Sequence, residues 1–132
     1  MKGFRRQRAA ELLRGFLGVE LARSTDDRLA RITLTEVDVS PDLRTAKIYW
    51  TTFETGPKAE LTGPPPILTE DDKSVKEARE ALHAARTELK RRIAQELDFR
   101  YVPTLHFTFD GSASQGARID FLLQKSGALS SS

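Results

Sequence analysis

The stretch that decides the fold is Arg100-Tyr101-Val102-Pro103-Thr104-Leu105-His106-Phe107-Thr108-Phe109-Asp110, near the C-terminal end of the chain. From Leu105 to Phe109, apolar and polar residues alternate, which is typical of a strand that buries one face. The following residues, Gly116 to Leu123, predict a short terminal helix. The stretch therefore predicts a strand followed by a helix, and the rest of the fold is built outward from this unit.

Upstream, two further strands are predicted to form an antiparallel hairpin. Residues 32–39 alternate but change phase near Glu36, which indicates a bulge. Ser40-Pro41-Asp42-Leu43 fits a type I turn, because proline pre-sets the φ angle that such a turn needs. The next strand points Ala46, Ile48 and Trp50 toward the core and leaves Tyr49 on the other face.

Apolar residues at helical spacing predict two substantial helices. The first spans Arg5 to Leu21 and is interpreted as amphipathic. The second starts either at Thr69 or at a capping box that Ser74 opens, since both offer a side-chain oxygen to unpaired N–H groups. Its apolar stripe comprises Ala78, Leu82, Ala85, Leu89, Ile93 and Leu97.

The predicted order of elements is helix, strand, strand, long helix, strand, short helix. Three strands with helices packed on one face of a small mixed sheet make an α+β fold, and this order matches a type II KH-like domain. We expect one domain over residues 1–132, with a Pro/Gly-rich surface loop at 53–68 and a flexible tail at about 125–132. The string Gly15-Phe16-Leu17-Gly18 has the form of a KH phosphate loop but lies in the first helix, so we interpret it as a chance match.

The amino-acid composition excludes several classes of function. The 132 residues include no cysteine, which excludes disulfides, thiol nucleophiles and thiolate zinc sites. No apolar run is long enough to span a bilayer, so a soluble cytoplasmic protein without membrane contact is expected. Residues 1–31 hold eight Lys or Arg against four Asp or Glu, and residues 81–100 hold five against three. These basic segments fit a surface that faces a polyanion, although solvated surface charge explains them equally simply.

Several segments, taken in order, resemble the bacterial ribosome-binding factor A family. They are Asp26-Asp27-Arg28, the hairpin from Val37 to Tyr49, the stretch from Arg100 to Phe107, and the spacing of Asp110, Ser112, Gly116, Arg118 and Ile119. The resemblance implies a KH-like fold in which a kink between two helices replaces the Gly-x-x-Gly loop. It also implies a non-enzymatic factor that assists maturation of the small ribosomal subunit.

The position that matches the family's interhelical kink reads Ala85-Arg86-Thr87 and lacks the family's glycine. A β-branched residue tolerates positive φ poorly, so we expect the helix to bend less there, or Thr87 to cap a following helical segment.

Two clusters of basic residues are candidates for contact with RNA. One surrounds the expected kink, and the other lies at the start of the first helix, where counterion release favours phosphate binding without any special geometry. For both, the alternative is a solvated helix flank. The predicted RNA-binding residues are Arg5, Arg6, Arg8, Arg86, Lys90 and Arg91.

No catalytic or metal site is predicted. His83 and His106 have no cysteine nearby and no recognisable carboxylate motif, and Glu70-Asp71-Asp72 is better explained as an acidic helix start. No cofactor is expected. The resemblance implies the immature small ribosomal subunit and its RNA as partner and a GTPase that promotes release, and a monomer is expected. The alternatives are a protein-interaction module of α+β fold without an RNA-binding role, and a small hydrolase that uses His83.

Overall fold

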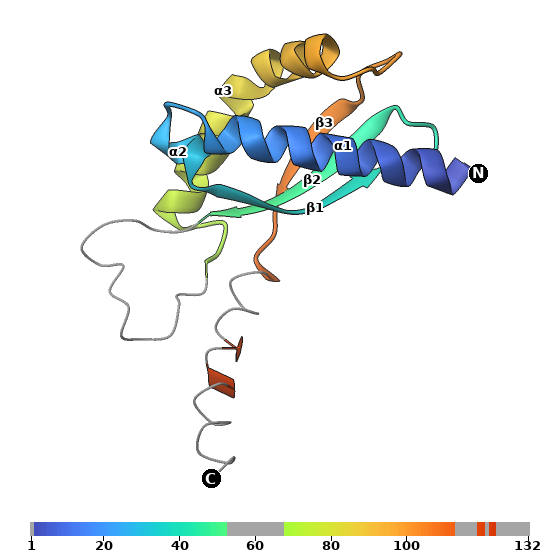
Figure 1. The fold of residues 1–132 in the computed structure, drawn as a ribbon. Helices are drawn as coiled ribbons and strands as arrows, with labels where there is room; N and C mark the ends of the chain where they lie inside the picture. Colours follow the sequence, from blue (N-terminus) through green and yellow to red (C-terminus); the bar gives the residue numbers. More distant parts are fainter. Residues whose placement is uncertain (1, 53–67, 113–118, 121, 124–132) are drawn as a thin grey trace.

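The computed structural model describes residues 2–52, 68–112, 119–120 and 122–123 (Figure 1). Within this part of the chain, helices and strands follow one another in the predicted α+β manner. The elements are α1 (Lys2–Ala22), α2 (Asp27–Ala30), β1 (Ile32–Val39), β2 (Thr45–Thr52), α3 (Lys73–Glu96) and β3 (Thr104–Phe109).

The three strands form one mixed sheet in the order β1-β2-β3. β1 and β2 pair antiparallel as the predicted hairpin, and the register shifts between Leu34 and Glu36, which confirms the predicted bulge. β3 pairs with β2 in parallel, with Ala46 opposite Leu105 and Trp50 opposite Phe109. A parallel pair needs a long crossover, and α3 supplies it.

The sheet buries one face and leaves the other open. Trp50 is fully buried, and its ring meets that of Phe109 edge-on, with the ring centroids 5.3 Å apart. Across the open face, Lys47 and His106 are exposed and Tyr49 is half-buried. The helices pack on the buried face, as predicted. The core comprises mainly Leu13, Leu17 and Leu21 of α1, Ile32 and Val39 of β1, Ala46, Ile48 and Trp50 of β2, Val75, Ala78, Leu82 and Ile93 of α3, and Leu105 of β3.

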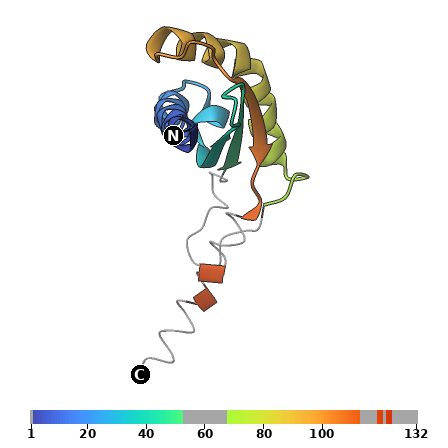
Figure 2. The same ribbon diagram turned by 90° about the vertical axis from the view of Figure 1, so that its right-hand side faces the viewer.

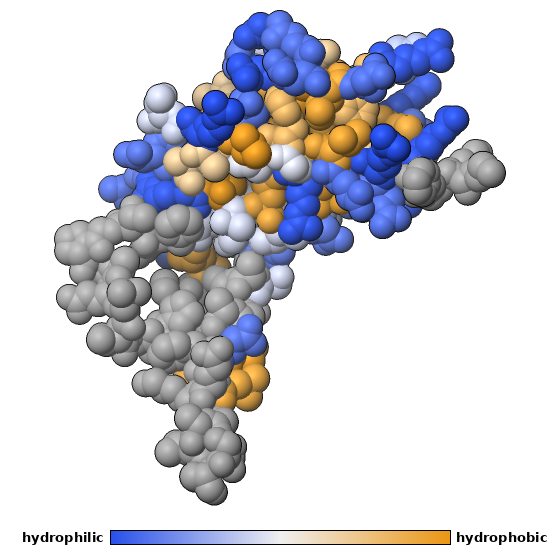
Figure 3. Space-filling model, in the orientation of Figure 1, coloured by the Kyte–Doolittle hydropathy of each residue, from blue (hydrophilic) through white to orange (hydrophobic). Residues whose placement is uncertain are grey.

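α1 lies along β1 and is tied to it near its N-terminal end. The Arg6 Nε donates a hydrogen bond to the carbonyl of Val39, and its Nη2 pairs with the Asp38 carboxylate at 3.1 Å. The helix is not simply amphipathic, because Leu12 and Val19 on its outer side are 44% and 51% exposed. Figure 3 shows hydrophobic surface on the face where α1 lies.

The sequence did not predict α2, which occupies part of the polar stretch between α1 and β1. Asp26 is its N-cap and accepts a hydrogen bond from the backbone N–H of Arg28 at 2.9 Å. The Arg28 guanidinium also binds this carboxylate at 2.9 Å and lowers the pKa of Asp26. A single turn therefore forms around one capping residue, too short to leave a periodic pattern.

α3 begins at neither of the predicted residues. Its N-cap is Asp72, and its first helical residue is Lys73. The Asp72 carboxylate makes no capping hydrogen bond and instead accepts one from the backbone N–H of Thr69 at 2.6 Å. Asp72 thus closes the turn before the helix, and Ser74 lies inside the first helical turn.

At Ala85-Arg86-Thr87, where the sequence predicts a weakened kink or the start of a second helix, α3 runs without interruption from Lys73 to Glu96. Thr87 therefore does not cap a second helix. Leu43, with φ of 61°, is the sole non-glycine residue with positive φ in the described part of the chain, so Thr87 keeps ordinary helical backbone. Figure 2 shows α3 following a curved course, its last turns running in a different direction from its first.

Some predictions fall on residues outside the described part of the chain. The predicted loop at 53–68 lies outside it except for Leu68, whose side chain is buried. The tail at 125–132 lies wholly outside it. Of the predicted terminal helix, Ile119, Asp120, Leu122 and Leu123 have helical backbone. No helix in the described ranges is long and apolar enough to cross a membrane.

Candidate nucleic-acid interface

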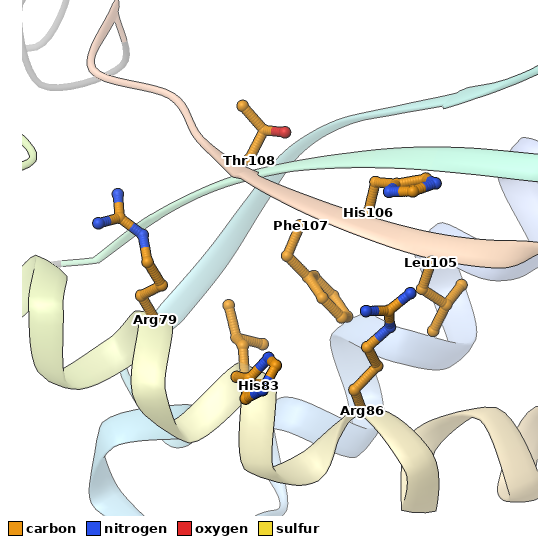
Figure 4. Close-up of a pocket in the computed structure, with 8 residues that line it drawn as sticks. Arg79, His83, Arg86, Leu105, His106, Phe107 and Thr108 are labelled. Carbon is orange, nitrogen blue, oxygen red and sulfur yellow. The ribbon is translucent and has the colours of Figure 1, made fainter.

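A groove between α3 and β3 gathers basic side chains from the helix and polar ones from the strand (Figure 4). Figure 4 shows Arg79, His83 and Arg86 in succession along α3, with both arginines extending toward β3. We call this feature the α3 groove. Its lining residues are Arg79, Leu82, His83, Arg86, Leu105, His106, Phe107 and Thr108.

Helical spacing explains why these cations share one side of α3. Arg79, His83 and Arg86 are separated by four and three residues, so they stack on one face of the helix, and Lys90 follows Arg86 one turn later. Opposite them, β3 is the last strand of the sheet, so within the described ranges the outer edge of its backbone has no strand partner. The groove thus places a row of cations beside open hydrogen-bonding groups.

The predicted cations on α3 differ in what they already bind. Within the described residues, no carboxylate lies at ion-pair distance from Arg86 or Lys90. Arg91 instead donates hydrogen bonds to Glu88, which raises the pKa of Arg91 and lowers the pKa of Glu88. Of the six predicted RNA-binding residues, Arg86 therefore lines the α3 groove. Lys90 lies one helical turn beyond Arg86, and Arg91 is paired with Glu88.

Two other arginines of α3 are engaged to different degrees. Arg79 pairs with Glu70 at 3.3 Å, and both side chains are largely exposed, so water and salt weaken this pair. Arg92 binds Glu20 of α1 through its Nε at 2.8 Å and Nη2 at 3.1 Å, and the Glu20 side chain is only 18% exposed. Arg92 therefore joins two helices, whereas the pair of Arg79 with Glu70 lies at the surface.

The N-terminal basic cluster lies elsewhere. Arg5 lines a hollow with Pro41, Asp42 and Leu43, and Arg8 is exposed. Arg6, in contrast, is held by Val39 and Asp38 of β1. We call the end of the molecule that comprises the start of α1, residues 40–44 and the connection 97–103 the turn end; it lies at the right in Figure 1.

The fold does not bring the two basic clusters together. The C-terminal part of α1 contacts α3, since Glu20 binds Arg92. Arg5 precedes Glu20 by fifteen residues on the same helix, which places it about 22 Å away along the helix axis. The N-terminal cluster therefore lies far along α1 from the point where α1 contacts Arg92 of α3.

Sequence reasoning missed several residues of the α3 groove. The sequence patterns indicate no binding role for His83 or His106 and do not single out Arg79 or Thr108. Arg79, His83, Arg86 and Lys90 could have been recognised from their helical spacing. His106 and Thr108 could not, because their position depends on the parallel pairing of β3 with β2, which brings β3 beside α3.

The ionisable side chains that line the α3 groove are those of Arg79, His83, Arg86 and His106. Among the described residues, no group of three His, Asp or Glu side chains comes together there as a metal ion would require. Glu70 and Asp72 of the acidic run bind Arg79 and Thr69 instead. The chemistry that this surface supports is recognition of negative charge.

Comparison with protein families matches residues 5–123 to the model of "Ribosome-binding factor A". A ribosome-binding factor A of Coxiella burnetii (strain CbuG_Q212) is 34% identical over 122 residues, which cover 92% of this chain and 88% of that protein. One from Shewanella sediminis is also 34% identical and covers 92% of this chain and 75% of its own length. One from Halothermothrix orenii is 32% identical over 126 residues, covering 95% and 90%.

Solved structures share the fold. The crystal structure of ribosome-binding factor A from Thermus thermophilus aligns with a TM-score of 0.59 at 21% identity, covering 79% of this chain and 93% of that one. The solution structure of a putative ribosome binding factor A from Thermotoga maritima aligns at 0.55 and 20% identity, covering 80% and 86%. These neighbours are KH-like, and the KH-like fold predicted from the sequence is thereby confirmed.

Proposed function

This chain belongs to the ribosome-binding factor A family, and we propose that it is a non-enzymatic assembly factor for the small ribosomal subunit. In this proposal it binds the immature subunit before that subunit joins the large one. It recognises the RNA of the subunit and assists the maturation of that RNA. Membership of the family supports the ribosome as partner. Binding to the small subunit, binding before the subunits join and contact through RNA are the parts that we propose.

The observation that carries the proposal is the row of cations in the α3 groove. Arg86 and Lys90 have no carboxylate partner among the described residues, and Arg79 has only an exposed one. A row of this kind gains affinity for a phosphate backbone through counterion release. The open edge of β3 and the side chains of His106 and Thr108 supply hydrogen-bonding groups on the opposite wall.

Phosphate binding in this proposal depends on side chains and not on a glycine loop. Gly15 and Gly18 lie inside α1, far along the chain from α3, and a helix interior cannot wrap a phosphate with its backbone N–H groups. α3 also passes through Ala85-Arg86-Thr87 without opening its backbone. Arg86 thus presents its guanidinium from a continuous helix, which fixes its direction toward β3.

The remaining parts of the proposal concern context. The chain acts as a single domain over residues 1–132 and as a monomer in the cytoplasm, without a cofactor. A ribosome-associated GTPase promotes its release from the subunit. Binding alone, without any chemical step, accounts for its contribution to maturation, since a bound factor stabilises the RNA conformation to which it binds.

Co-sedimentation with purified small ribosomal subunits at increasing salt tests the proposal. We expect wild-type protein to pellet with small subunits, to pellet less with large subunits, and to dissociate as salt rises. Arg86→Glu/Lys90→Glu should weaken binding about tenfold or more, because each change replaces an attractive contact with a repulsive one.

The double variant should fold normally, since Arg86 is half-buried, Lys90 is exposed, and neither holds an ion pair within the described ranges. Unchanged circular dichroism and thermal midpoint would verify this. A folded double variant that binds as tightly as wild type would refute the α3 groove as the RNA-binding site. Binding that is insensitive to both salt and these changes would favour a protein-interaction module.

A further inference from the structure

Tyr101 is presented to solvent at the turn end by a connection that is otherwise anchored. Tyr101 is 75% exposed, which is the largest value among the exposed large hydrophobic residues of the described chain. On either side, Phe99 and Val102 pack against the core, and Pro103 is fully buried. The ring therefore projects from a segment whose backbone is fixed, which lowers the entropy that a partner would have to remove on binding.

Arg100 lies against one face of this ring. Its guanidinium carbon is 5.9 Å from the ring centroid, within the range of a cation–π contact. A planar cation beside an aromatic ring leaves the other face of the ring open to a further planar group. A nucleobase is such a group, and bases stack readily on both tyrosine and arginine.

Other arginines surround this pair. The backbone N–H of Thr104, at the end of the same connection, donates to the carbonyl of Arg44 at 2.8 Å, which holds the connection beside the hairpin turn. Arg5 lines a hollow with Pro41 and Leu43 of that turn. Figures 1 and 2 both place the start of α1, the hairpin turn and the connection before β3 at one end of the molecule.

The charge of this end is predominantly positive. Within the described residues, Arg5, Arg8, Arg44 and Arg100 have no carboxylate at ion-pair distance.

The acidic residues of this end are mostly engaged. The Asp38 carboxylate forms an ion pair with Arg6. The Asp42 carboxylate accepts hydrogen bonds from the Ser40 hydroxyl and the backbone N–H of Arg44. Asp98 is the remaining exposed carboxylate of the connection. An exposed aromatic ring beside arginines that have no carboxylate partner in the described chain is a combination that proteins use to bind single-stranded nucleic acid.

We propose that Tyr101 and Arg100 form a stacking site for an unpaired base of ribosomal RNA, with Arg5 and Arg44 binding the adjoining phosphates. The inference rests on the proposed function, which supplies the RNA. It adds a contact that is separate from the α3 groove and differs from it in kind, because the groove binds charge whereas this site binds a base. The two sites lie on different elements, since the α3 groove is lined by α3 and β3 and the stacking pair lies on the connection between them.

Substitution of Tyr101 tests the site in the full-length chain. Binding to purified small ribosomal subunits would be measured at fixed salt for wild type, Tyr101→Ala and Tyr101→Phe. We expect Tyr101→Ala to weaken binding about tenfold, in line with the loss of one stacked base, and Tyr101→Phe to bind within about twofold of wild type. Val19→Ala, which trims an exposed apolar residue on α1, should leave binding unchanged.

A spectroscopic readout separates stacking from a structural role. Tyr101→Trp places an indole at the site, and its emission should be quenched when small subunits are added, whereas Trp50 is fully buried and contributes a constant background. The thermal midpoint of every variant should equal that of wild type. Tyr101→Ala binding as tightly as wild type would overturn the site alone. Absence of wild-type binding would overturn the proposed function together with it.

Discussion

The arginines of the α3 groove and those of the turn end differ in what they bind within the fold. At the turn end, Arg6 is part of the scaffold, because it holds the end of β1 through Val39 and Asp38. In the α3 groove, Arg86 faces β3 without a carboxylate partner in the described chain, while its neighbour Arg91 is paired with Glu88. The number of basic residues in a segment therefore overstates the charge available to a polyanion, and ion pairing within the fold decides which cations remain.

The substitution with the largest expected effect lowers the stability of the α3 groove and of the turn end together. Leu17 of α1 has no exposed surface, and its replacement by alanine should cost about 2 to 5 kcal/mol of unfolding free energy through lost burial and a residual cavity. α1 carries the arginines of the turn end and binds α3 through Glu20, so both regions depend on its packing. Urea unfolding measures the loss. Leu12→Ala, on the exposed side of the same helix, is the control and should cost less than about 1 kcal/mol.

A smaller loss of stability should distinguish the alanine variant of Arg6 from that of Arg8. Arg6→Ala removes a charged hydrogen bond to the Val39 carbonyl and the pair with Asp38, and we expect a loss of about 1 to 2 kcal/mol in stability. Arg8→Ala should change stability by less than about 0.5 kcal/mol, because Arg8 is exposed and has no ion pair in the described chain. Thermal and urea unfolding of both variants would check this. Equal losses would show that Arg6 has no special structural role.

The smallest effect concerns the strand that forms one wall of the α3 groove. At the end of β3, Asp110 accepts hydrogen bonds from Ser112 and from the Thr35 hydroxyl, and these bonds lower the pKa of Asp110 from its ordinary value of 3.8. A lowered pKa in the folded state contributes stability that is present above the unfolded value and is lost as pH falls through the folded one.

Asp110→Asn should therefore cost about 1 kcal/mol near pH 7, and the difference from wild type should shrink below about pH 4. Urea unfolding at several pH values measures this difference. A gap between the two proteins that stayed constant down to about pH 2 would contradict the assignment of the lowered pKa to Asp110.

Local patterns predicted the sheet well and the ends of helices poorly. Alternation in residues 32–39 and 45–52 was sufficient for the hairpin, the bulge and the inward position of Trp50, because a strand's periodicity is set by its own backbone. The starts of α2 and α3 each depend on a single carboxylate, that of Asp26 or Asp72. Local backbone geometry decides which N–H group donates a hydrogen bond to that carboxylate. Several residues near each start offered an equivalent oxygen.

For the candidate site, the sequence predicted the residue types but not their partners. The pair of Glu88 with Arg91 could be read from its spacing of three residues on a helix. The pairs of Arg6 with Asp38 and Arg92 with Glu20 join residues far apart in the chain, and only the packing of α1 against β1 and α3 creates them. The α3 groove likewise exists because β3 pairs parallel to β2 and so lies beside α3.

The salt dependence of binding tests most directly whether unpaired cations, and not total charge, contact the RNA. Arg86→Gln and Arg91→Gln each remove one positive charge, so they are matched in net charge and differ in position. We predict that Arg86→Gln lowers the slope of log affinity against log salt for small ribosomal subunits by about 0.7 to 0.9, while Arg91→Gln leaves the slope at the wild-type value. Equal reductions in the two slopes would contradict this, because they would show that only overall charge matters.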